Sequence, residues 1–471
     1  MSGFFTLGER KDRPGIYKRI GNRDQTNVVS ARDGIGCAVV SGSWGPLNTA
    51  MTIQASDDIK KFIGTGTGHD VLKQMFKGGV QSAVVVRVGT GGTTGTVQLK
   101  DTATSPASVV SFTAKYPGTR SLSVSVKTSL AESTLKEVVL YDGTEKLESR
   151  TIEAGDAEVD AVVAAFANSA YVNVTKVAAG NGTLAAVSQA ALTGGTDPTV
   201  TTEAYSTGFT TAEPEVWDCI CVDTNDTAVH TLLSTYIDRI FDGGALPMAA
   251  LSEPSTVTLD ARITKAASYN NEKIVYVLNG WKDADGAAVE GYLAAARIAG
   301  MIAAIRSNES LTHREISDAV SLIESMTNGQ IIKAIKSGCL VISKSKTGNV
   351  VIEKAINTLV EPAKNQDEGW KKIRRVKARF EMMSRIEITL DRFTGQVNND
   401  NDGRAAIIAA GQAVLDAMVG EGKLFTGASF ELDESNPPEG DSAWFVITAD
   451  DIDSFETGYL SFMFRFTADV A

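Results

Sequence analysis

The stretch Ile274-Val-Tyr-Val-Leu278 decides the fold class of the central part of the chain. Every position in it is apolar, so a strand formed here has no polar face to turn toward water. Such strands are typical of parallel sheets that helices cover on both faces. Other expected strands and helices alternate around it, at 216–222, 228–241, 246–250, 259–269 and 289–305. This alternation predicts a doubly wound α/β core.

The same core extends in both directions along the chain. Toward the N-terminus, the apolar runs 35–40 and 82–88 predict strands, and 57–77 predicts a helical segment that glycines interrupt. Toward the C-terminus, 338–343 and 349–353 predict a closing hairpin. We therefore expect the core to be assembled from segments on both sides of an insertion.

Residues 90–200 form that insertion, because their composition shifts toward Thr, Ser, Gly and Val. In 121–127, Leu122, Val124 and Val126 share one face and serines share the other, which predicts a half-buried strand. One helix is expected at 157–167. Glycine-rich stretches at 89–92 and 194–198 bracket the region and predict hinges. The insertion is interpreted as a small β-rich domain.

Residues 361–471 change character again. A helix is expected through Met382, Ile386, Leu390 and Phe393, and a second one over 404–418. The run 370–379 is strongly basic and could contact nucleic acid, but no aromatic ladder accompanies it. A solvated or protein-facing strand is the better interpretation.

The last residues predict a strand with one strongly apolar face. Leu460, Phe462, Phe464 and Phe466 alternate with more polar positions, and the sequence supplies no turn or partner strand after them. Such a strand needs a sheet to join. That sheet could belong to its own domain or to a neighbouring subunit.

Composition excludes several classes of protein. The 471 residues carry a net charge of −12, which argues against general nucleic-acid binding. No apolar run is long enough for a membrane span, and the N-terminus lacks a signal peptide. The four cysteines fit a reducing cytoplasm, where we expect the protein to be made. Cys219 and Cys221 would share one face of a strand, and buried inert thiols are a better interpretation than a metal site.

Catalytic chemistry finds little support. Only three histidines occur, and no Gly-x-Ser-x-Gly elbow is present. The glycines of 64–68 lack the Lys-Ser/Thr pair of a phosphate loop. Asp283 with Asp285, and Asp400 with Asp402, are interpreted as turn formers, because neither pair continues to the glutamate of a calcium loop. We expect no catalytic, cofactor-binding or metal site.

Several motifs, in their order along the chain, resemble the tail sheath proteins of contractile bacteriophages and phage-like (R-type) bacteriocins. They are Arg13-Pro-Gly-Ile-Tyr17, the glycine-then-strand segment 78–88, Ala114-Lys-Tyr-Pro-Gly118, 192–197, the helix and loop at 299–303 and 310–312, and 395–400 with 402–404. The resemblance implies a structural, non-enzymatic virion protein of a contractile tail. It would polymerise as a six-fold helical sleeve around the tail tube and contract to drive the tube through the target cell envelope.

The resemblance also implies a multidomain α/β plus β fold. It would comprise an N-terminal arm (1–20), a subtilisin-like α/β core (21–90 and 201–360), an inserted β-sandwich-like domain (91–200), a C-terminal α+β domain (361–455) and a C-terminal strand or arm (456–471). The alternatives are a degenerate subtilisin-like hydrolase and another self-assembling phage tail or shell protein.

The implied partners are other copies of the chain, the tail tube protein, and baseplate and tail terminator proteins, with no nucleic acid, membrane insertion or cofactor. Inter-subunit strand addition would use both chain ends: Pro14, Gly15, Ile16, Tyr17, Leu460, Phe462, Phe464 and Phe466. Contact with the tube would use Asn398, Asn399, Asp402 and Arg404.

Overall fold

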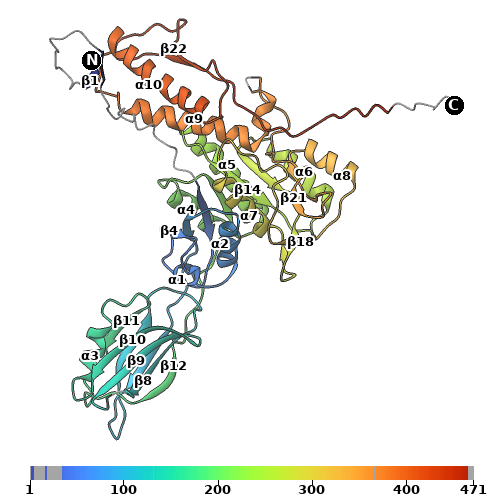
Figure 1. Cartoon of the computed structure of the whole chain (residues 1–471). Coiled ribbons are helices and arrows are strands. Elements are labelled where there is room, and N and C mark those ends of the chain that lie inside the picture. Colours follow the sequence, from blue (N-terminus) through green and yellow to red (C-terminus); the bar gives the residue numbers. More distant parts are fainter. Residues whose placement is uncertain (1, 5–15, 19–33, 131, 365, 465–471) are drawn as a thin grey trace. The chain divides into compact units, whose positions relative to one another are not determined.

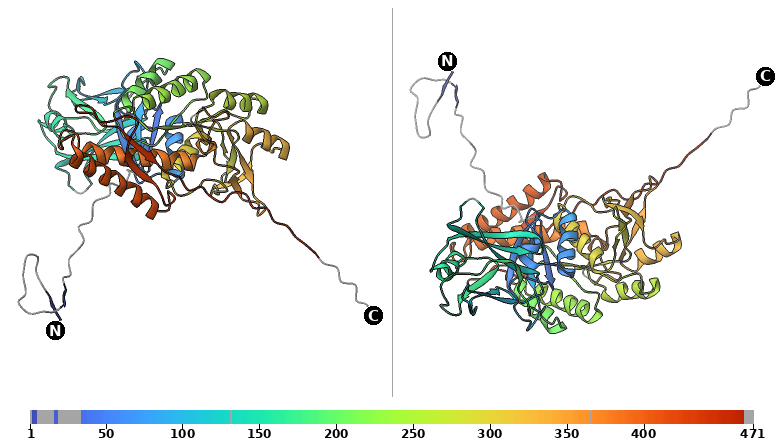
Figure 2. Two further views of the ribbon diagram at one scale, coloured as in Figure 1. Left: turned by 90° about the horizontal axis from the view of Figure 1, so that it is seen from above. Right: turned by 90° about the horizontal axis from the view of Figure 1, so that it is seen from below.

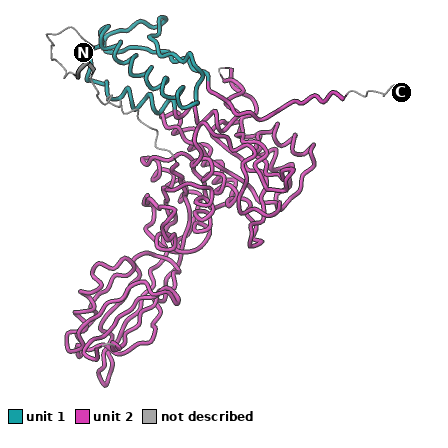
Figure 3. The backbone as a smooth tube through the Cα atoms, in the orientation of Figure 1, with its two compact units in different colours: residues 1–31, 382–450 teal, residues 32–381, 451–471 magenta. Residues whose placement is uncertain are grey.

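The computed structural model describes residues 2–4, 16–18, 34–130, 132–364 and 366–464. The chain divides into two compact units (Figure 3). The smaller unit contains 1–31 and 382–450, and the larger unit contains 32–381 and 451–471. Within the described residues, no helix is both long enough and apolar enough to cross a membrane.

A parallel sheet forms the centre of the larger unit (Figure 1). Six of its strands run parallel, and only the edge strand β4 is antiparallel to its neighbour β5. The predicted doubly wound core is therefore confirmed. In spatial order the strands are β19 (Cys339–Leu340), β15 (Ile274–Val277), β14 (Met248–Ser252), β13 (Cys219–Val222), β3 (Ile35–Val40), β5 (Ser82–Arg87) and β4 (Ala50–Gln54).

Helices cover both faces of this sheet, because alternate side chains of each strand enter different apolar layers. In β13, Cys219 and Cys221 lie in one layer, while Ile220 and Val222 lie in the other. The first layer receives α1 (Ile59–Ile63), α2 (Thr67–Lys77) and α7 (Tyr292–Ala304). The second receives α4 (Thr202–Ala212), α5 (Thr227–Asp242), α6 (Leu259–Tyr269) and α8 (Asn328–Lys336).

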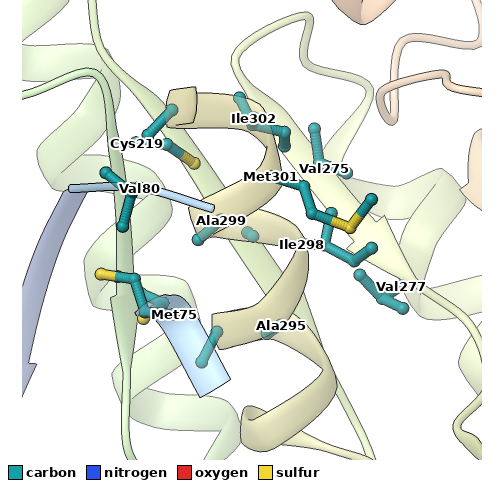
Figure 4. Close-up of a cluster of buried hydrophobic side chains, with 14 of the residues drawn as sticks. Met75, Val80, Cys219, Val275, Val277, Ala295, Ile298, Ala299, Met301 and Ile302 are labelled. Atoms are coloured by element: carbon teal, nitrogen blue, oxygen red, sulfur yellow. The ribbon is translucent and has the colours of Figure 1, made fainter. Parts of the chain in front are cut away.

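Small residues let α7 lie close to its neighbours in the first layer (Figure 4). A Cβ atom on Gly300 would come within 2.0 Å of the Met75 carbonyl oxygen of α2, so only glycine fits there. All four cysteines are buried and unpaired with one another, and burial raises the pKa of each thiol. These thiols are packing residues, as the sequence predicted.

Short strands complete the core around this sheet. The predicted closing hairpin is formed by β20 (Ile342–Lys344) and β21 (Val350–Ile352). A second small antiparallel sheet contains β17 (Ala288–Val289), β16 (Trp281–Asp283) and β18 (Ala319–Leu322). At the N-terminus, β1 (Ser2–Phe4) pairs in parallel with β2 (Ile16–Lys18).

The inserted region is a β-sandwich. One antiparallel sheet has the order β10 (Glu145–Glu153), β9 (Leu135–Asp142), β8 (Leu122–Thr128) and β12 (Val187–Ala191); the other has the order β11 (Val172–Lys176), β7 (Ser108–Ala114) and β6 (Thr96–Lys100), and α3 (Glu158–Ala165) covers one end. Leu122, Val124 and Val126 enter the core as predicted. The prediction for the opposite face was wrong, because Ser123 and Ser125 are also buried. Gln189 from the neighbouring β12 donates a hydrogen bond to the Ser123 hydroxyl at 2.8 Å.

The two connections between the sandwich and the core, which were predicted as hinges, pair with each other. Thr90 exchanges backbone hydrogen bonds with Thr199 at 2.9 and 3.0 Å, and Thr93 does the same with Thr196. The glycines of both stretches therefore belong to a two-stranded stalk. Sequence inspection missed it because the two partners are far apart along the chain.

Two side chains from the core contact the sandwich and stabilise the junction between these two domains. Trp44 is 2% exposed and lies in the apolar core of the sandwich, with its ring 5.2 Å from that of Tyr116. Arg87, which is fully buried, donates to the carbonyl oxygens of Gly45 at 2.6 Å and of Pro117 at 2.9 Å. Burial lowers the pKa of Arg87 to about 10, so it remains charged at neutral pH.

The C-terminal part contains two helices and a hairpin. They are α9 (Ile373–Asp391), which follows the 3-10 turn η1 (Glu368–Lys371), then α10 (Asn401–Gly420), and the paired strands β22 (Ser429–Leu432) and β23 (Phe445–Thr448). The basic run was predicted as a strand but is the first half of α9. Its apolar residues Ile373, Val376 and Phe380 recur at helical spacing and are buried, while the basic residues lie between them.

We predict that Trp44→Ala destabilises the β-sandwich by about 3 to 5 kcal/mol, because the lost indole leaves a cavity in its core. Hydrogen exchange of the β7 and β8 amides in the full-length protein measures the effect as faster exchange. Trp444→Ala removes an indole that is 43% exposed and is the matched control. Equal exchange in the two variants would contradict the assigned role of Trp44.

Candidate assembly site

The C-terminal segment leaves the larger unit without joining a sheet. The described residues 452–464 form neither helix nor strand, and both views of Figure 2 show their ribbon running outward alone. Leu460 is 81% exposed, Phe462 76% and Phe464 93%. Large apolar side chains gathered in this way on a soluble protein mark a contact surface.

The segment is extended, but it is not yet a strand. Tyr459 and Met463 are exposed as well, so both faces of the predicted alternation lie in water. A strand exists only when its backbone groups pair with a neighbour, and the described part of the chain provides none for this segment. The predicted strand is therefore not formed within the described residues, and its pairing with another copy stays a prediction.

Asp451 anchors the start of this segment to α9. It is 8% exposed, and it accepts hydrogen bonds from two guanidinium groups. Arg375 binds both of its carboxylate oxygens, and Arg379 donates to Oδ1 from Nη2 at 2.9 Å. Burial by itself raises the pKa of Asp451, but these hydrogen bonds outweigh it, so the pKa lies below its usual range.

A second contact to the same region forms a few residues further along the segment. Lys372 Nζ lies 2.6 Å from Asp453 Oδ2 and 3.0 Å from Glu456 Oε2. Burial by itself lowers the pKa of Lys372, and hydrogen bonding to the two carboxylates outweighs that effect and raises it. We call Lys372, Arg375, Arg379, Asp451, Asp453 and Glu456 the anchor.

Sequence analysis missed the anchor, although two signals were present. Basic residues repeat at intervals of three and four in 372–379, which is helical spacing, and an acidic cluster occupies 450–456. Partners so far apart in sequence are brought together only by the fold.

The smaller unit offers an open sheet edge. In the hairpin, Phe430 lies on α10, where a Cβ on Gly411 would come within 2.5 Å of its ring. The strand β23 leaves Trp444, Val446 and Ile447 partly exposed. Gln412 of α10 occupies part of the β22 edge, because it accepts from the Phe430 amide at 3.0 Å and donates to the Ala428 carbonyl oxygen at 3.0 Å. The described contacts include no such partner along the outer edge of β23, so another strand could be added there.

The other predicted connector residues are only partly described. Ile16 and Tyr17 lie in β2, opposite Ser2 and Gly3 of β1. Pro14, Gly15 and Phe466 lie outside the described residues. Strand addition between copies stays a prediction for all of these positions.

The predicted tube-contact residues divide into two pairs. Asn399 donates to the carbonyl oxygens of Gly440 and Ser442, and Arg404 donates to the carbonyl oxygen of Asn399 at 2.8 Å. These two side chains therefore hold the turn before α10 in place. Asn398 and Asp402 are exposed and free of such internal roles among the described contacts.

The described residues show no arrangement for acid–base catalysis. His230 is buried, its Nε2 lies 2.9 Å from the Thr224 carbonyl oxygen, and burial lowers its pKa. His69 contacts Asp70, and none of the three imidazoles bonds to a Ser, Thr or Cys side chain in this part of the chain. No cluster of three or more potential metal-ligating side chains was found among the described residues either.

Comparison with known protein families gives two matches. Residues 90–197 match the model for the phage tail sheath protein beta-sandwich domain, and residues 199–358 match the model for the phage tail sheath protein central domain. Together these matches cover more than half of the chain.

Curated relatives and solved structures agree with these matches. The protein is 24% identical to YqbK, an uncharacterized protein, and to the phage-like element PBSX protein XkdK, both of Bacillus subtilis strain 168, over 79% of this chain and 78% and 79% of theirs. The sheath tail protein of Desulfitobacterium hafniense has a similar fold, with a TM-score of 0.72, 20% identity, and coverage of 93% of this chain and 100% of that one. The helical sheath of the anti-feeding prophage in its contracted state matches with a TM-score of 0.54, 10% identity, and coverage of 96% and 99%.

The anchor should hold only within a window of pH. The lowered pKa of Asp451 means that its stabilisation is complete above its ordinary pKa of about 3.9 and is lost as pH falls through the lower folded value. The raised pKa of Lys372 means that its contribution is complete below about 10.4 and is lost as pH rises further. We predict an ordered segment from about pH 4 to 10.

A spin label on Phe455→Cys reports this order through its line shape, since the native thiols are buried. The label should become mobile below pH 4. A label on Met463→Cys, beyond the anchor, should be mobile throughout. An unchanged line shape at position 455 between pH 7 and pH 2 would contradict the assignment.

Proposed function

Because the chain belongs to the phage tail sheath protein family, we propose that its copies polymerise into a six-fold helical sleeve around a tail tube. The protein is a structural subunit of a tail sheath and not an enzyme. Contraction of the sleeve drives the tube through the envelope of a target cell. The fold shared with the anti-feeding prophage sheath, which is known in a contracted state, supports this proposal.

The observation that carries the proposal is the exposed apolar segment after the anchor. Leu460, Phe462 and Phe464 alternate along an extended segment whose backbone has no strand partner among the described residues. In the assembly this segment adds to a sheet of a neighbouring copy. Backbone hydrogen bonds then give strength, and the alternating side chains fix the register.

The energies suit a permanent connection. Each added backbone hydrogen bond contributes roughly 1 kcal/mol net, and each buried Leu or Phe side chain roughly 2 kcal/mol. A strand of about seven residues reaches roughly 23 Å, which is enough to cross an interface between copies. Several such bonds per copy would keep the subunits linked while they move.

The acceptor is the hairpin of β22 and β23 in the C-terminal domain of another copy. Its open edge and the partly exposed Trp444, Val446 and Ile447 supply both backbone and apolar partners. The N-terminal arm, with Pro14, Gly15, Ile16 and Tyr17, is the second connector. Bending near Gly15 and Gly458 lets both arms stay attached during contraction.

The domain division follows the same family pattern. The core is subtilisin-like and is built from 21–90 and 201–360, with the β-sandwich of 91–200 inserted. An α+β domain occupies 361–455, and the arms occupy 1–20 and 456–471. Separate apolar cores support the division for the sandwich and for the region after Met382, whereas Ile373, Val376 and Phe380 pack with the parallel sheet.

Contraction needs no nucleotide in this account. The extended sleeve is a metastable lattice, and its release into a lower-energy lattice supplies the work. The alternative of a degenerate subtilisin-like hydrolase is disfavoured, because no imidazole lies beside a nucleophile among the described residues. The alternative of another self-assembling tail or shell protein is disfavoured by the two sheath-domain matches.

The C-terminal domain carries the contact with the tube protein. Residues 382–450 contain twelve Asp and Glu against four Lys and Arg, so the surface they contact should be basic. Asn398 and Asp402 are exposed beside the start of α10, while Asn399 and Arg404 shape that turn. The ends of the sleeve contact baseplate and tail terminator proteins.

The protein is a component of a phage or phage-like tail. We place its synthesis in the cytoplasm of the host bacterium and its site of action in the virion. It binds neither nucleic acid nor membrane in this role.

We predict that deleting 459–471 leaves a folded monomer that forms no sleeves. The sharper test replaces Leu460, Phe462 and Phe464 with serine, since this keeps the chain length and removes roughly 6 kcal/mol of burial. Electron micrographs of concentrated protein count the sleeves. The matched control is Met463→Ser on the opposite face, and normal sleeves from the triple variant would refute strand addition.

We also predict that Asp402→Lys weakens cosedimentation of assembled sleeves with tail tubes by about tenfold, because it places a positive charge against a basic surface. Asp441→Lys makes the same charge change elsewhere in the domain and should have a smaller effect. Equal binding by both variants would remove Asp402 from the contact.

A further inference from the structure

The anchor lies at a boundary between two parts of the chain. Residues up to Asp450 belong to the smaller unit, and the chain returns to the larger unit at Asp451. At this first residue the chain meets Arg375 and Arg379 of α9. The exposed arm therefore begins from a point fixed on the larger unit.

The first half of α9 is itself firmly attached to the core. Ile373, Val376 and Phe380 are buried in the first apolar layer of the parallel sheet. Lys377 donates to the carbonyl oxygen of Ile305 at 2.7 Å, at the C-terminal end of α7. A cation at that end satisfies carbonyl groups that the helix leaves unpaired and favours the helix dipole.

The anchor has further connections to the core. Arg379 also binds both oxygens of Asp367 at 2.9 Å, which ties it to the turn before α9. Glu456 accepts a hydrogen bond from Thr312 at 3.0 Å, and Thr312 in turn accepts one from the backbone of Ala355. The start of the arm is thus bound directly to two segments of the larger unit, 372–379 and the loop of Thr312, and Arg379 is held in turn by Asp367.

We propose that Lys372, Arg375 and Arg379 are positioning residues that transmit the pull of a neighbouring copy into the core. This inference rests on the proposed strand addition. A force applied to 457–464 first reaches the anchor. From there α9 carries it to the parallel sheet. The hairpin of β22 and β23 precedes the anchor in the chain, so this force does not act on it.

The hairpin needs this protection because of its geometry. Without the anchor, the next fixed element before the arm is β23, a short strand of a two-stranded sheet. A pull on the end of such a strand opens its hydrogen bonds one after another, and an isolated hairpin has little stability of its own. Yet this hairpin is also the proposed acceptor for the arm of another copy. Force on the arm of one copy would then weaken the interface in which the hairpin of that copy holds the arm of another.

The test compares Asp451→Asn with Asp285→Asn. Each removes one negative charge, but Asp285 lies in an exposed turn of the larger unit, outside both the anchor and the hairpin. In the monomer, a spin label on Phe455→Cys should become mobile in Asp451→Asn only, with the ordered population falling at least tenfold. In assembled sleeves, the β22 and β23 amides should exchange at least tenfold faster in Asp451→Asn only.

A second variant keeps the test decisive if Asp451→Asn is poorly folded. Asp453→Asn with Glu456→Gln removes the Lys372 contacts at half-buried positions and should change both readouts in the same direction. The inference is overturned if the label stays ordered, or if hairpin exchange in sleeves matches the Asp285→Asn control. Absence of sleeves from the unmodified protein would instead refute the proposed function, and the monomer label distinguishes the two failures.

Discussion

An extended apolar segment without a strand partner among the described residues is the constraint on which this molecule depends. Residues 457–464 expose large apolar side chains, which is unfavourable in water, beside backbone groups that only water satisfies in the described part of the chain. A single copy does not bury these side chains within its described residues. In the proposed assembly, the segment buries them against another copy. The protein fits a family whose members act as polymers.

The remaining structure gives this connection a firmly packed attachment point. Side chains of α7 and α9 are buried against one face of the parallel sheet, and Trp44 and Arg87 lock the sandwich to the same body. The arm begins at Asp451, on this rigid part. A flexible joint at either place would let subunit motion be absorbed locally, whereas buried charged and aromatic contacts pass the motion onward. Stability and force transmission thus use the same contacts.

Local patterns in the sequence predicted the elements whose environment is local. The apolar run 274–278 indicated a strand buried on both faces, and the helix over 259–269 is α6 itself. Predictions failed where distant residues decide the structure. The basic run is a helix whose apolar residues are buried in the core and whose cations meet Asp451 and Asp367, and the glycine-rich stretches pair with each other across the insertion. The sequence pattern predicted the apolar face of the arm. It did not predict the anchor, because the partner of Arg375 and Arg379 in the arm lies more than 70 residues away along the chain.

A helical reconstruction of assembled sleeves by electron cryomicroscopy tests the central claim most directly. The account predicts that Leu460, Phe462 and Phe464 are buried, and that their backbone pairs with β22 or β23 of a different copy. Both chain ends folded onto their own subunit, with no strand shared between copies, would contradict it.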